Sequence, residues 1–215
     1  MARSASERSA AEQPLAGWLA GVAILVNAFF VGGVLMGFEM LGSRYLFPYF
    51  GGGIGTWAGL ISTVLAALTI GYFVGGAVVD RHPSARVITA SCAIAAAYLA
   101  LVPMTADPLM MAIMNDIGYG PVGILIGSAC LLLVPLSFLG TFSPVAVRLL
   151  LRSTHETGRI AGLVYGISTI GNIFGTLFTT FYLIPTIGSR EITYVYAAVL
   201  ALCALSLLLV PKAQA

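Results

Sequence analysis

Long apolar runs alternate with short polar segments from residue 15 onward. Six of these runs are long enough for a helix to cross the hydrocarbon core of a bilayer, which takes about 20 mainly apolar residues, and they are too long for the core helices of a soluble domain. The pattern therefore predicts an all-α, polytopic membrane bundle of six transmembrane helices. Their expected bounds are 15–41, 57–80, 87–104, 122–152, 160–187 and 192–210.

Composition supports a membrane protein. The hydrophobic fraction is 59%, the charged fraction is 8% and the mean hydropathy is +1.00, all outside the range of a soluble globular domain. The length of 215 residues leaves no room for a separate soluble domain beside the six spans. We expect a disordered cytoplasmic tail at 1–14, a transmembrane domain at 15–211 and a cytoplasmic C-terminal tail at 212–215.

The cationic side chains predict the orientation of the bundle. Eight of the ten fall on one side and two on the other, and the richer side is expected to face the cytoplasm. The stretch from Trp18 to Phe38 is uncharged and longer than the apolar part of a signal peptide, so the first span is expected to be retained. Both termini are then cytoplasmic. The inner cations are Arg3, Arg8, Arg81, Arg86, Arg148, Arg152, Arg159 and Lys212, and the outer ones are Arg44 and Arg190.

Small residues recur at four-residue spacing within the apolar runs, which lets helix backbones approach closely. We interpret these pairs as packing positions within one bundle, with an oligomer seam as the alternative. Ala58-Gly59-Leu60 and Ala161-Gly162-Leu163 each open the middle span of one half, which is consistent with an inverted three-plus-three repeat. The pairs are Gly33 with Gly37, Gly71 with Gly75, Gly123 with Gly127, Gly162 with Gly166, and Gly171 with Gly175.

Glu39 is an acidic residue in the outer part of the first span, five residues before Arg44. An ionisable group inside a membrane is costly unless it is paired or reached by water, and it is functional by default. We predict that Glu39 binds a cationic substrate or carries a coupling proton. The alternative is a structural ion pair with Arg44 or Arg190. The predicted substrate-binding residues are Glu39, Asn27, Arg44 and Asn172.

Two groups of charges lie at the inner ends of the spans. Asp80 and Arg81, with Gly76 before them and Arg86 after them, resemble the inner-loop pattern of major facilitator transporters, in which the aspartate caps a helix end and the arginine locks the inward gate. A charged stop signal is the alternative. The second group fits contact with anionic headgroups or pairing with Glu156, and docking of a cytoplasmic partner is the alternative. It contains Arg148, Arg152, His155, Glu156 and Arg159.

Patterns for catalysis, cofactors and metals are missing from the sequence. His82 and His155 have no cysteine or carboxylate at metal-site spacing, and no basic residue completes the glycine run at 51–55 as a nucleotide-binding loop. That glycine run is instead expected to interrupt the helical structure between the first two spans. The cysteines lie inside apolar runs, and the net charge of +2 does not indicate nucleic-acid binding. We expect no catalytic site, no metal and no cofactor.

Two stretches, 37–50 with 71–81 and 140–144 with 158–185, resemble the membrane domain of spermidine synthase-like fusion proteins. In that bacterial family a bundle similar to half of a major facilitator fold precedes a cytosolic aminopropyltransferase-type domain, which implies a bacterial inner membrane. The chain has no such synthase domain, so synthase activity is not expected in it. The matching positions are Glu39, Arg44, Pro48, Gly51, Trp57, Gly71, Tyr72, Gly75, Gly76, Asp80, Arg81, Ser143, Pro144, Arg148, Gly158, Arg159, Gly162, Tyr165, Ser168, Gly171, Gly175, Phe181, Pro185 and Gly188.

Two hypotheses follow for function. The first is a transport module for a small cationic, polyamine-like solute, in which two copies, or one copy and a homologous half, form a cavity within membrane lipid. The second is a non-catalytic anchor or partner subunit for a soluble synthase-like protein or a larger membrane complex, with Arg148, Arg152 and Arg159 as the docking cluster. The residues available to line a polar route are Glu39, Asn27, Ser62, Thr63, Ser168, Thr169 and Asn172.

Overall fold

The structure of the chain is a computed structural model that describes residues 3–151 and 156–208, with only the backbone for residues 3–17. All regular structure in these ranges is helical. Six helical stretches are long and apolar enough to cross a membrane, so the chain is an integral, multi-pass membrane protein. Numbered 1 to 6, these spans are Trp18–Phe50, Ile54–Arg81, Ala85–Asp116, Pro121–Leu150, Thr157–Thr186 and Ser189–Leu208.

Span 1 belongs to helix α1 (Arg3–Phe50), which continues beyond the predicted end at residue 41. The helix also begins inside the segment 1–14 that composition assigns to a loose tail, and the order of that tail stays a prediction. α1 ends where Gly51 adopts a φ of +72°, a left-handed conformation that suits glycine. Helix α2 (Ile54–Arg81) follows at once. Residues 51–53 of the glycine run therefore separate the first two spans, whereas Ile54 and Gly55 already belong to α2, which begins before the predicted residue 57.

Helix α3 (Ala85–Asp116) is longer than the sequence predicted. We expected the span to end near residue 104, but the helix continues through Pro103 and Pro108 to Asp116. Proline is tolerated in membrane helices because neighbouring groups can satisfy the carbonyl that loses its donor. The connection to span 4 is consequently short, and Gly118 turns it with a φ of +94°.

Spans 4 and 5 are interrupted helices. Each contains a wider π-helical segment just before a proline, Pro135 in span 4 and Pro185 in span 5. A proline nitrogen cannot donate a hydrogen bond, so the helix loosens in the preceding turn. In span 4 the hydroxyl of Tyr98 from α3 donates to the carbonyl of Cys130 in the widened turn. The elements are α4 (Pro121–Ser128), η1 (Ala129–Leu133), α5 (Val134–Gly140) and α6 (Phe142–Leu150) in span 4, and α7 (Thr157–Phe178), η3 (Thr179–Leu183) and α8 (Ile184–Thr186) in span 5.

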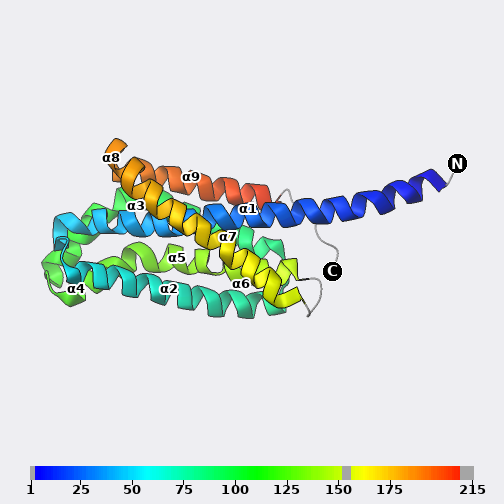
Figure 1. The fold of residues 1–215 in the computed structure, drawn as a ribbon. Coiled ribbons are helices and arrows are strands. Elements are labelled where there is room, and N and C mark those ends of the chain that lie inside the picture. The colour runs from blue at the N-terminus through cyan, green and yellow to red at the C-terminus, as the bar shows by residue number, and fades with distance from the viewer. Residues whose placement is uncertain (1–2, 152–155, 209–215) are drawn as a thin grey trace.

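The six spans pair in a regular way (Figure 1). Span 1 packs along span 5, span 2 along span 4, and span 3 along span 6, which is helix α9 (Ser189–Leu208). Span 1 also contacts span 6, and span 4 contacts span 3. Spans 2 and 5 bury the smallest share of their residues. The inside of the bundle is therefore built from spans 1, 3, 4 and 6. Its large, fully buried side chains include Phe38, Leu41, Leu99, Leu132, Leu136, Phe142 and Ile192.

Glycine makes the closest helix contacts possible. A Cβ atom on Gly75 of α2 would lie 2.8 Å from the Cα atom of Thr141, and one on Gly175 of α7 would lie 2.6 Å from the Cα atom of Gly33. Both distances are too short for a side chain, so the backbones of spans 2 and 4 touch, as do those of spans 1 and 5. Between membrane helices, such contact gives packing that lipid cannot replace. The glycine pairs at 71 and 75 and at 171 and 175 are thus packing positions.

Candidate functional site

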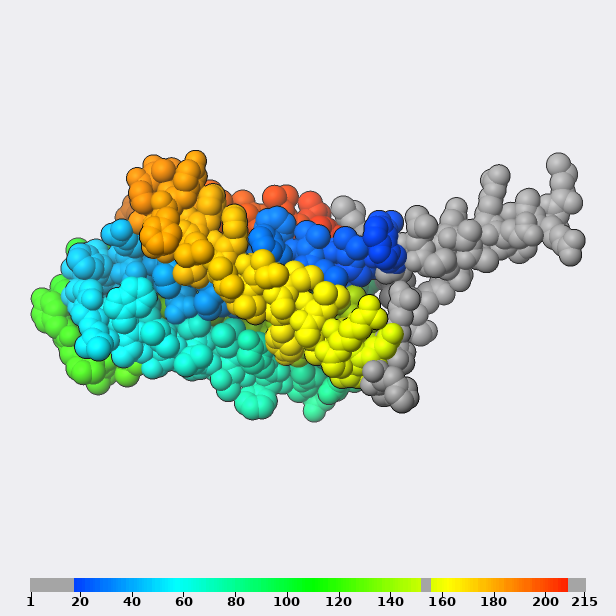
Figure 2. Space-filling model, viewed as in Figure 1, coloured from blue at the N-terminus to red at the C-terminus, as the bar shows by residue number. Residues whose placement is uncertain are grey.

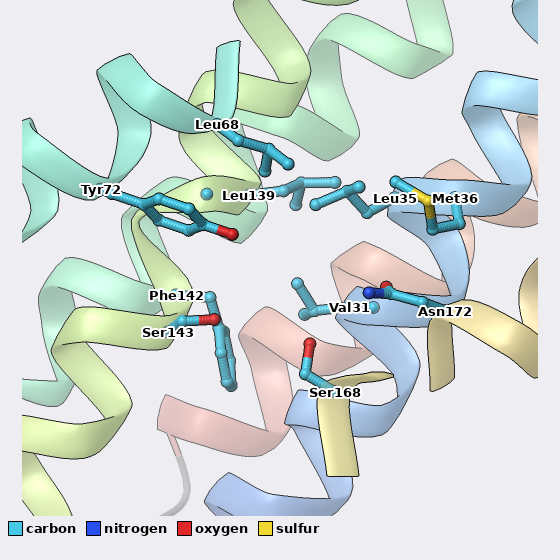
Figure 3. A pocket seen from close by; sticks show the side chains of 12 residues that line it. Val31, Leu35, Met36, Leu68, Tyr72, Leu139, Phe142, Ser143, Ser168 and Asn172 are labelled. Atoms are coloured by element: carbon cyan, nitrogen blue, oxygen red, sulfur yellow. The ribbon is translucent and has the colours of Figure 1, made fainter. Parts of the chain in front are cut away.

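A small cavity lies where spans 1, 2, 4 and 5 come together (Figure 3). Its volume is about 40 Å³. One water molecule needs roughly 10–15 Å³ of such space, so the cavity has room for a few waters. Span 1 supplies a mainly apolar wall, and the other three spans supply polar groups. The lining residues are Val31, Gly32, Leu35, Met36, Leu68, Tyr72, Leu139, Gly140, Phe142, Ser143, Ser168 and Asn172.

Four polar side chains determine the chemistry of this cavity. Figure 3 shows the hydroxyls of Tyr72, Ser143 and Ser168 and the amide of Asn172 around the same space. Within the described chain these three hydroxyls make no hydrogen bond, and the Asn172 Oδ1 atom is buried without a donor. Ser143 is only 8% exposed. The cavity therefore presents several oxygen atoms that are free to accept hydrogen bonds from a small polar or cationic group.

Gly32 of α1 makes the room for the polar side of the cavity. A Cβ atom at this position would lie 2.9 Å from Asn172 Oδ1 and 3.0 Å from Ser168 Oγ. Both contacts are too close, so any side chain at residue 32 would press on these two groups. Glycine thus brings α1 and α7 together and leaves the oxygen atoms uncovered.

The cavity opens between α2 and α7, which flank it without extensive contact with each other. Tyr72 of α2 is 42% exposed, and Tyr165 of α7 is 45% exposed and close enough to interact with Tyr72 electrostatically. Figure 2 looks onto this side of the molecule, where α1, in blue, is visible between yellow α7 and the cyan to teal surface of α2.

Glu39 lies on α1 about one helical turn outward from Leu35, which lines the cavity. It also follows Gly32 by nearly two turns, and residues at these spacings share one face of a helix. The Glu39 side chain is 8% exposed and forms no hydrogen bond or ion pair with a described residue. A buried carboxylate in a membrane needs a proton, water or a cation. Glu39 is therefore the strongest candidate for a functional residue next to the cavity.

The other two predicted binding residues of span 1 lie apart from the cavity. Arg44 is exposed and forms no ion pair with a described carboxylate, Glu39 included. Asn27 faces α9, where its Nδ2 atom donates to Ser206 Oγ at 3.0 Å and to the Ala23 carbonyl at 2.8 Å. Asn27 thus holds spans 1 and 6 together. Of the four predicted binding residues, Asn172 lines the cavity and Glu39 adjoins it.

Charged residues at the C-terminal ends of spans 2 and 4 form an ion pair. Asp80 Oδ1 lies 4.0 Å from Arg148 Nε, and both side chains are largely exposed. Arg148, which the sequence placed in the docking cluster, is therefore close to the predicted gating residue. Arg81 and Arg159 are exposed and have no ion pair with a described carboxylate, and Arg152 lies outside the described residues.

At the opposite end of the bundle, a second group of side chains ties three helices together. The guanidinium of Arg190 from α9 pairs with Asp107 of α3, and the Tyr49 hydroxyl of α1 donates to Asp107 Oδ1 at 3.2 Å. Arg190 is thus engaged by Asp107 and not by Glu39. The interpretation of Glu39 as a structural partner of Arg190 or Arg44 has no support in these contacts.

Sequence reasoning gave no role to Tyr72 and Ser143, although both are at positions that carry the family resemblance. Tyr72 follows Gly71, whose packing against span 4 is the available signal, and Ser143 precedes Pro144 in the first turn of α6. In the described part of the chain, no group of three or more histidine, cysteine or acidic residues is placed to hold a metal ion.

Comparisons with protein-family models, with curated proteins and with solved structures find no match for this chain. The cavity, the buried carboxylate beside it and the charged helix ends are thus the features that bear on function. Hydroxyl and amide oxygens together with a carboxylate suit a group that donates hydrogen bonds and carries positive charge, such as an ammonium.

Proposed function

We propose that the chain is a transport module for a small cationic, polyamine-like solute. The observation that carries the proposal is Glu39, a buried carboxylate without a partner in the described chain, beside a cavity of unpaired oxygen acceptors. Intramembrane acids without a structural partner mark substrate or proton pathways. A protonated amine supplies a positively charged partner for Glu39 and hydrogen-bond donors for the Oδ1 atom of Asn172.

The packing of the spans supports an inverted repeat, similar to half of a major facilitator fold. In such a repeat, spans 1, 2 and 3 correspond to spans 4, 5 and 6. The contact between spans 1 and 5 then corresponds to the contact between spans 4 and 2. The contact between spans 1 and 6 corresponds to the contact between spans 4 and 3. The close backbone contacts of these span pairs follow the same correspondence. Phe29 and Gly33 meet the glycine pair of span 5 at the same four-residue spacing at which Ser137 and Thr141 meet the pair of span 2. Inverted repeats with a site at their interface are typical of secondary transporters.

The size of the cavity bears on how a solute binds. A volume of about 40 Å³ admits one ammonium group but not a whole polyamine chain. In the proposed mechanism one ammonium occupies the polar cavity near Asn172 while Glu39 supplies the counter-charge. The remainder of the solute extends through the opening between α2 and α7 into space that a second half encloses.

The inner ion pair gives the proposed module a gate. Asp80 and Arg148 join the cytoplasmic ends of spans 2 and 4, the two helices that meet at the cavity through Tyr72 and Ser143. Separation of this pair would let the inner ends move apart. The resemblance to the inner-loop pattern of major facilitator transporters supports the same role for Asp80 and Arg81.

Orientation and location follow from the charges and the resemblance. The excess of arginine at the ends that carry Arg81, Arg86 and Arg159 supports a cytoplasmic position for that side and for both termini. The resemblance to the membrane domain of spermidine synthase-like fusion proteins supports a bacterial inner membrane and a polyamine-related solute.

A membrane anchor is the second candidate. Arg81 and Arg159 are exposed without a described ion partner, as a docking surface for a soluble synthase-like protein requires. Co-purification of such a protein that survives neutralisation of Arg148, Arg152 and Arg159 would count against docking at this cluster. The buried carboxylate has no role in an anchor, which is why transport is the preferred function.

A flux assay tests the transport proposal. The purified chain is reconstituted in vesicles, and entry of labelled putrescine and spermidine is compared for the native protein, Glu39→Gln and Glu191→Gln. Glu191 is an exposed acid at the outer start of α9 and serves as the matched control. We expect Glu39→Gln to lose nearly all flux while Glu191→Gln keeps it. Native flux no greater than in empty vesicles would exclude transport of these amines, and equal flux in Glu39→Gln would exclude the carboxylate.

A further inference from the structure

We propose that a second copy of this chain packs against the face formed by α2 and α7 and that this contact completes the cavity. The inference deepens the proposed function, because it names the partner that encloses the solute. The contact surface, called the α2–α7 face, consists of Leu65, Thr69, Tyr72 and Gly76 from α2 and of Gly158, Gly162, Tyr165, Gly166 and Thr169 from α7.

Several glycines on this face have no neighbour among the described residues. A Cβ atom at Gly158, Gly162 or Gly166 would meet nothing within 4 Å, and the same holds for Gly76. Glycine inside a helix costs roughly 0.5–1 kcal/mol relative to alanine, and membrane helices use it where another backbone approaches. On the same helix, the space beside Gly175 is filled by the backbone of Gly33. The empty row is therefore a packing surface whose partner lies outside the chain.

Polar side chains on this face point to a protein partner rather than lipid. Tyr72, Tyr165 and Thr169 are exposed, and their hydroxyls form no hydrogen bond within the described chain. Lipid tails offer no acceptor or donor, whereas a neighbouring helix does. Beyond Tyr194, which is also exposed, the large exposed side chains of α9 are apolar. They include Val195, Leu202, Leu205 and Leu208.

The cavity itself is incomplete in one chain. Ser143 is more than nine-tenths buried, has no hydrogen-bond partner in the described chain and lines the cavity with Asn172, whose Oδ1 atom is also unpaired. Tyr72 of the α2–α7 face lines the cavity, and α7 contributes Ser168 and Asn172 to its wall. A chain placed over this face closes the opening, separates the unpaired groups from lipid and enlarges the enclosed volume.

A second copy fits this face better than an unrelated protein does. A twofold contact uses the same patch on both partners, so the patch must carry both projections and hollows. The α2–α7 face has both, with Tyr72 and Tyr165 as projections and Gly162 and Gly166 as hollows. Two copies with the same orientation in the membrane share such a face about an axis along the membrane normal.

A pair of matched substitutions tests the contact. Gly166→Leu adds a side chain where the chain's own atoms leave open space, so the fold of one copy is preserved, and Ala201→Leu adds the same side chain on the lipid-facing side of α9. Self-association of the purified chain in vesicles is measured by energy transfer between labelled copies on dilution with lipid. We expect the native chain and Ala201→Leu to form dimers. Gly166→Leu should dissociate at a protein density in the membrane at least about tenfold higher than the density at which the native chain dissociates. A monomeric native chain, or equal dissociation of the two variants, would overturn the proposal.

Crosslinking locates the face. In a background with Cys92, Cys130 and Cys203 replaced by alanine, a short bifunctional maleimide is expected to link copies through Thr169→Cys. It is not expected to link them through Leu205→Cys. The reverse result would place the contact elsewhere. Neither experiment measures flux, so a dimer through this face that moves no amine refutes the transport function alone, and a monomer that transports refutes the contact alone.

Discussion

Gly175 of α7 lies against Gly33 of α1 so closely that a Cβ atom on Gly175 would come within 2.6 Å of the Gly33 Cα atom. The contact fixes span 5 on span 1 and, one turn further inward, places Asn172 and Ser168 over Gly32 at the cavity. The geometry of the site thus depends on backbone contact at this seam.

Substitution at the seam is expected to destabilise the bundle. Gly175→Ala forces α1 and α7 apart, and overpacking of this kind costs typically about 1–3 kcal/mol. Gly166→Ala on the exposed face of the same helix has open space around its Cβ atom and serves as the control, with a gain of roughly 0.5–1 kcal/mol because alanine is the better helix former. Thermal unfolding in detergent checks both. Equal stability of the two variants would contradict the close seam.

The ion pair between Asp80 and Arg148 is expected to act in transport and not in stability. Both side chains are largely exposed and their closest charged atoms are 4.0 Å apart, so Asp80→Asn should change stability by no more than about 1 kcal/mol. As an inner gate, the pair should nevertheless influence flux. We expect altered flux in Asp80→Asn and partial recovery in the exchange of Asp80→Arg with Arg148→Asp. Native flux in Asp80→Asn would argue against a gate.

Asn172 is expected to matter for amine flux and not for the stability of the bundle. Its buried Oδ1 atom has no donor in the described chain, so Asn172→Leu removes an unpaired polar group. Replacing an unsatisfied group by an apolar one of similar shape is nearly neutral or stabilising. We expect unchanged or higher thermal stability together with a loss of amine flux. A large loss of stability would show that the amide is a structural element of the bundle.

The orientation of the spans is testable with reporters that distinguish the two sides of the membrane. Pro83 lies in the exposed turn between spans 2 and 3, and Asn115 is exposed near the outer end of span 3. If span 3 crosses the membrane, reporters at these two positions must give opposite signals, with the Pro83 site cytoplasmic according to the positive charges around it. Signals from the same compartment would refute the crossing.

The positions of all six spans could be predicted because each leaves a long apolar run in the sequence. The residues at which the spans end were harder to predict. Composition suggested that span 3 stops near residue 104, but Pro103 and Pro108 are accommodated within the helix, and only Gly118 turns the chain. In the same way α1 continues to Phe50. A proline is a weak end signal in a membrane helix because neighbouring helices can compensate for the lost hydrogen bond.

The site could be predicted only in part. Glu39 and Asn172 were found because polar groups in apolar runs are conspicuous, but the same criterion selected Asn27, which bonds to Ser206 on another side of α1. Spacing along one helix does not reveal which neighbour each face meets. For the same reason the glycine pairs at 171 and 175 and at 162 and 166 are alike in sequence, although the first is packed against α1 and the second is open.

Equilibrium binding of a labelled diamine to the purified chain tests the central claim most directly, because it requires neither a gate nor a gradient. The account predicts saturable binding of putrescine, no competition by butanediol, which lacks the charge, and affinity at least about tenfold lower in Glu39→Gln, the loss expected for one buried charge-assisted contact. Binding that is absent in the native chain, or is undiminished in Glu39→Gln, would contradict a cation site formed by Glu39 and the cavity.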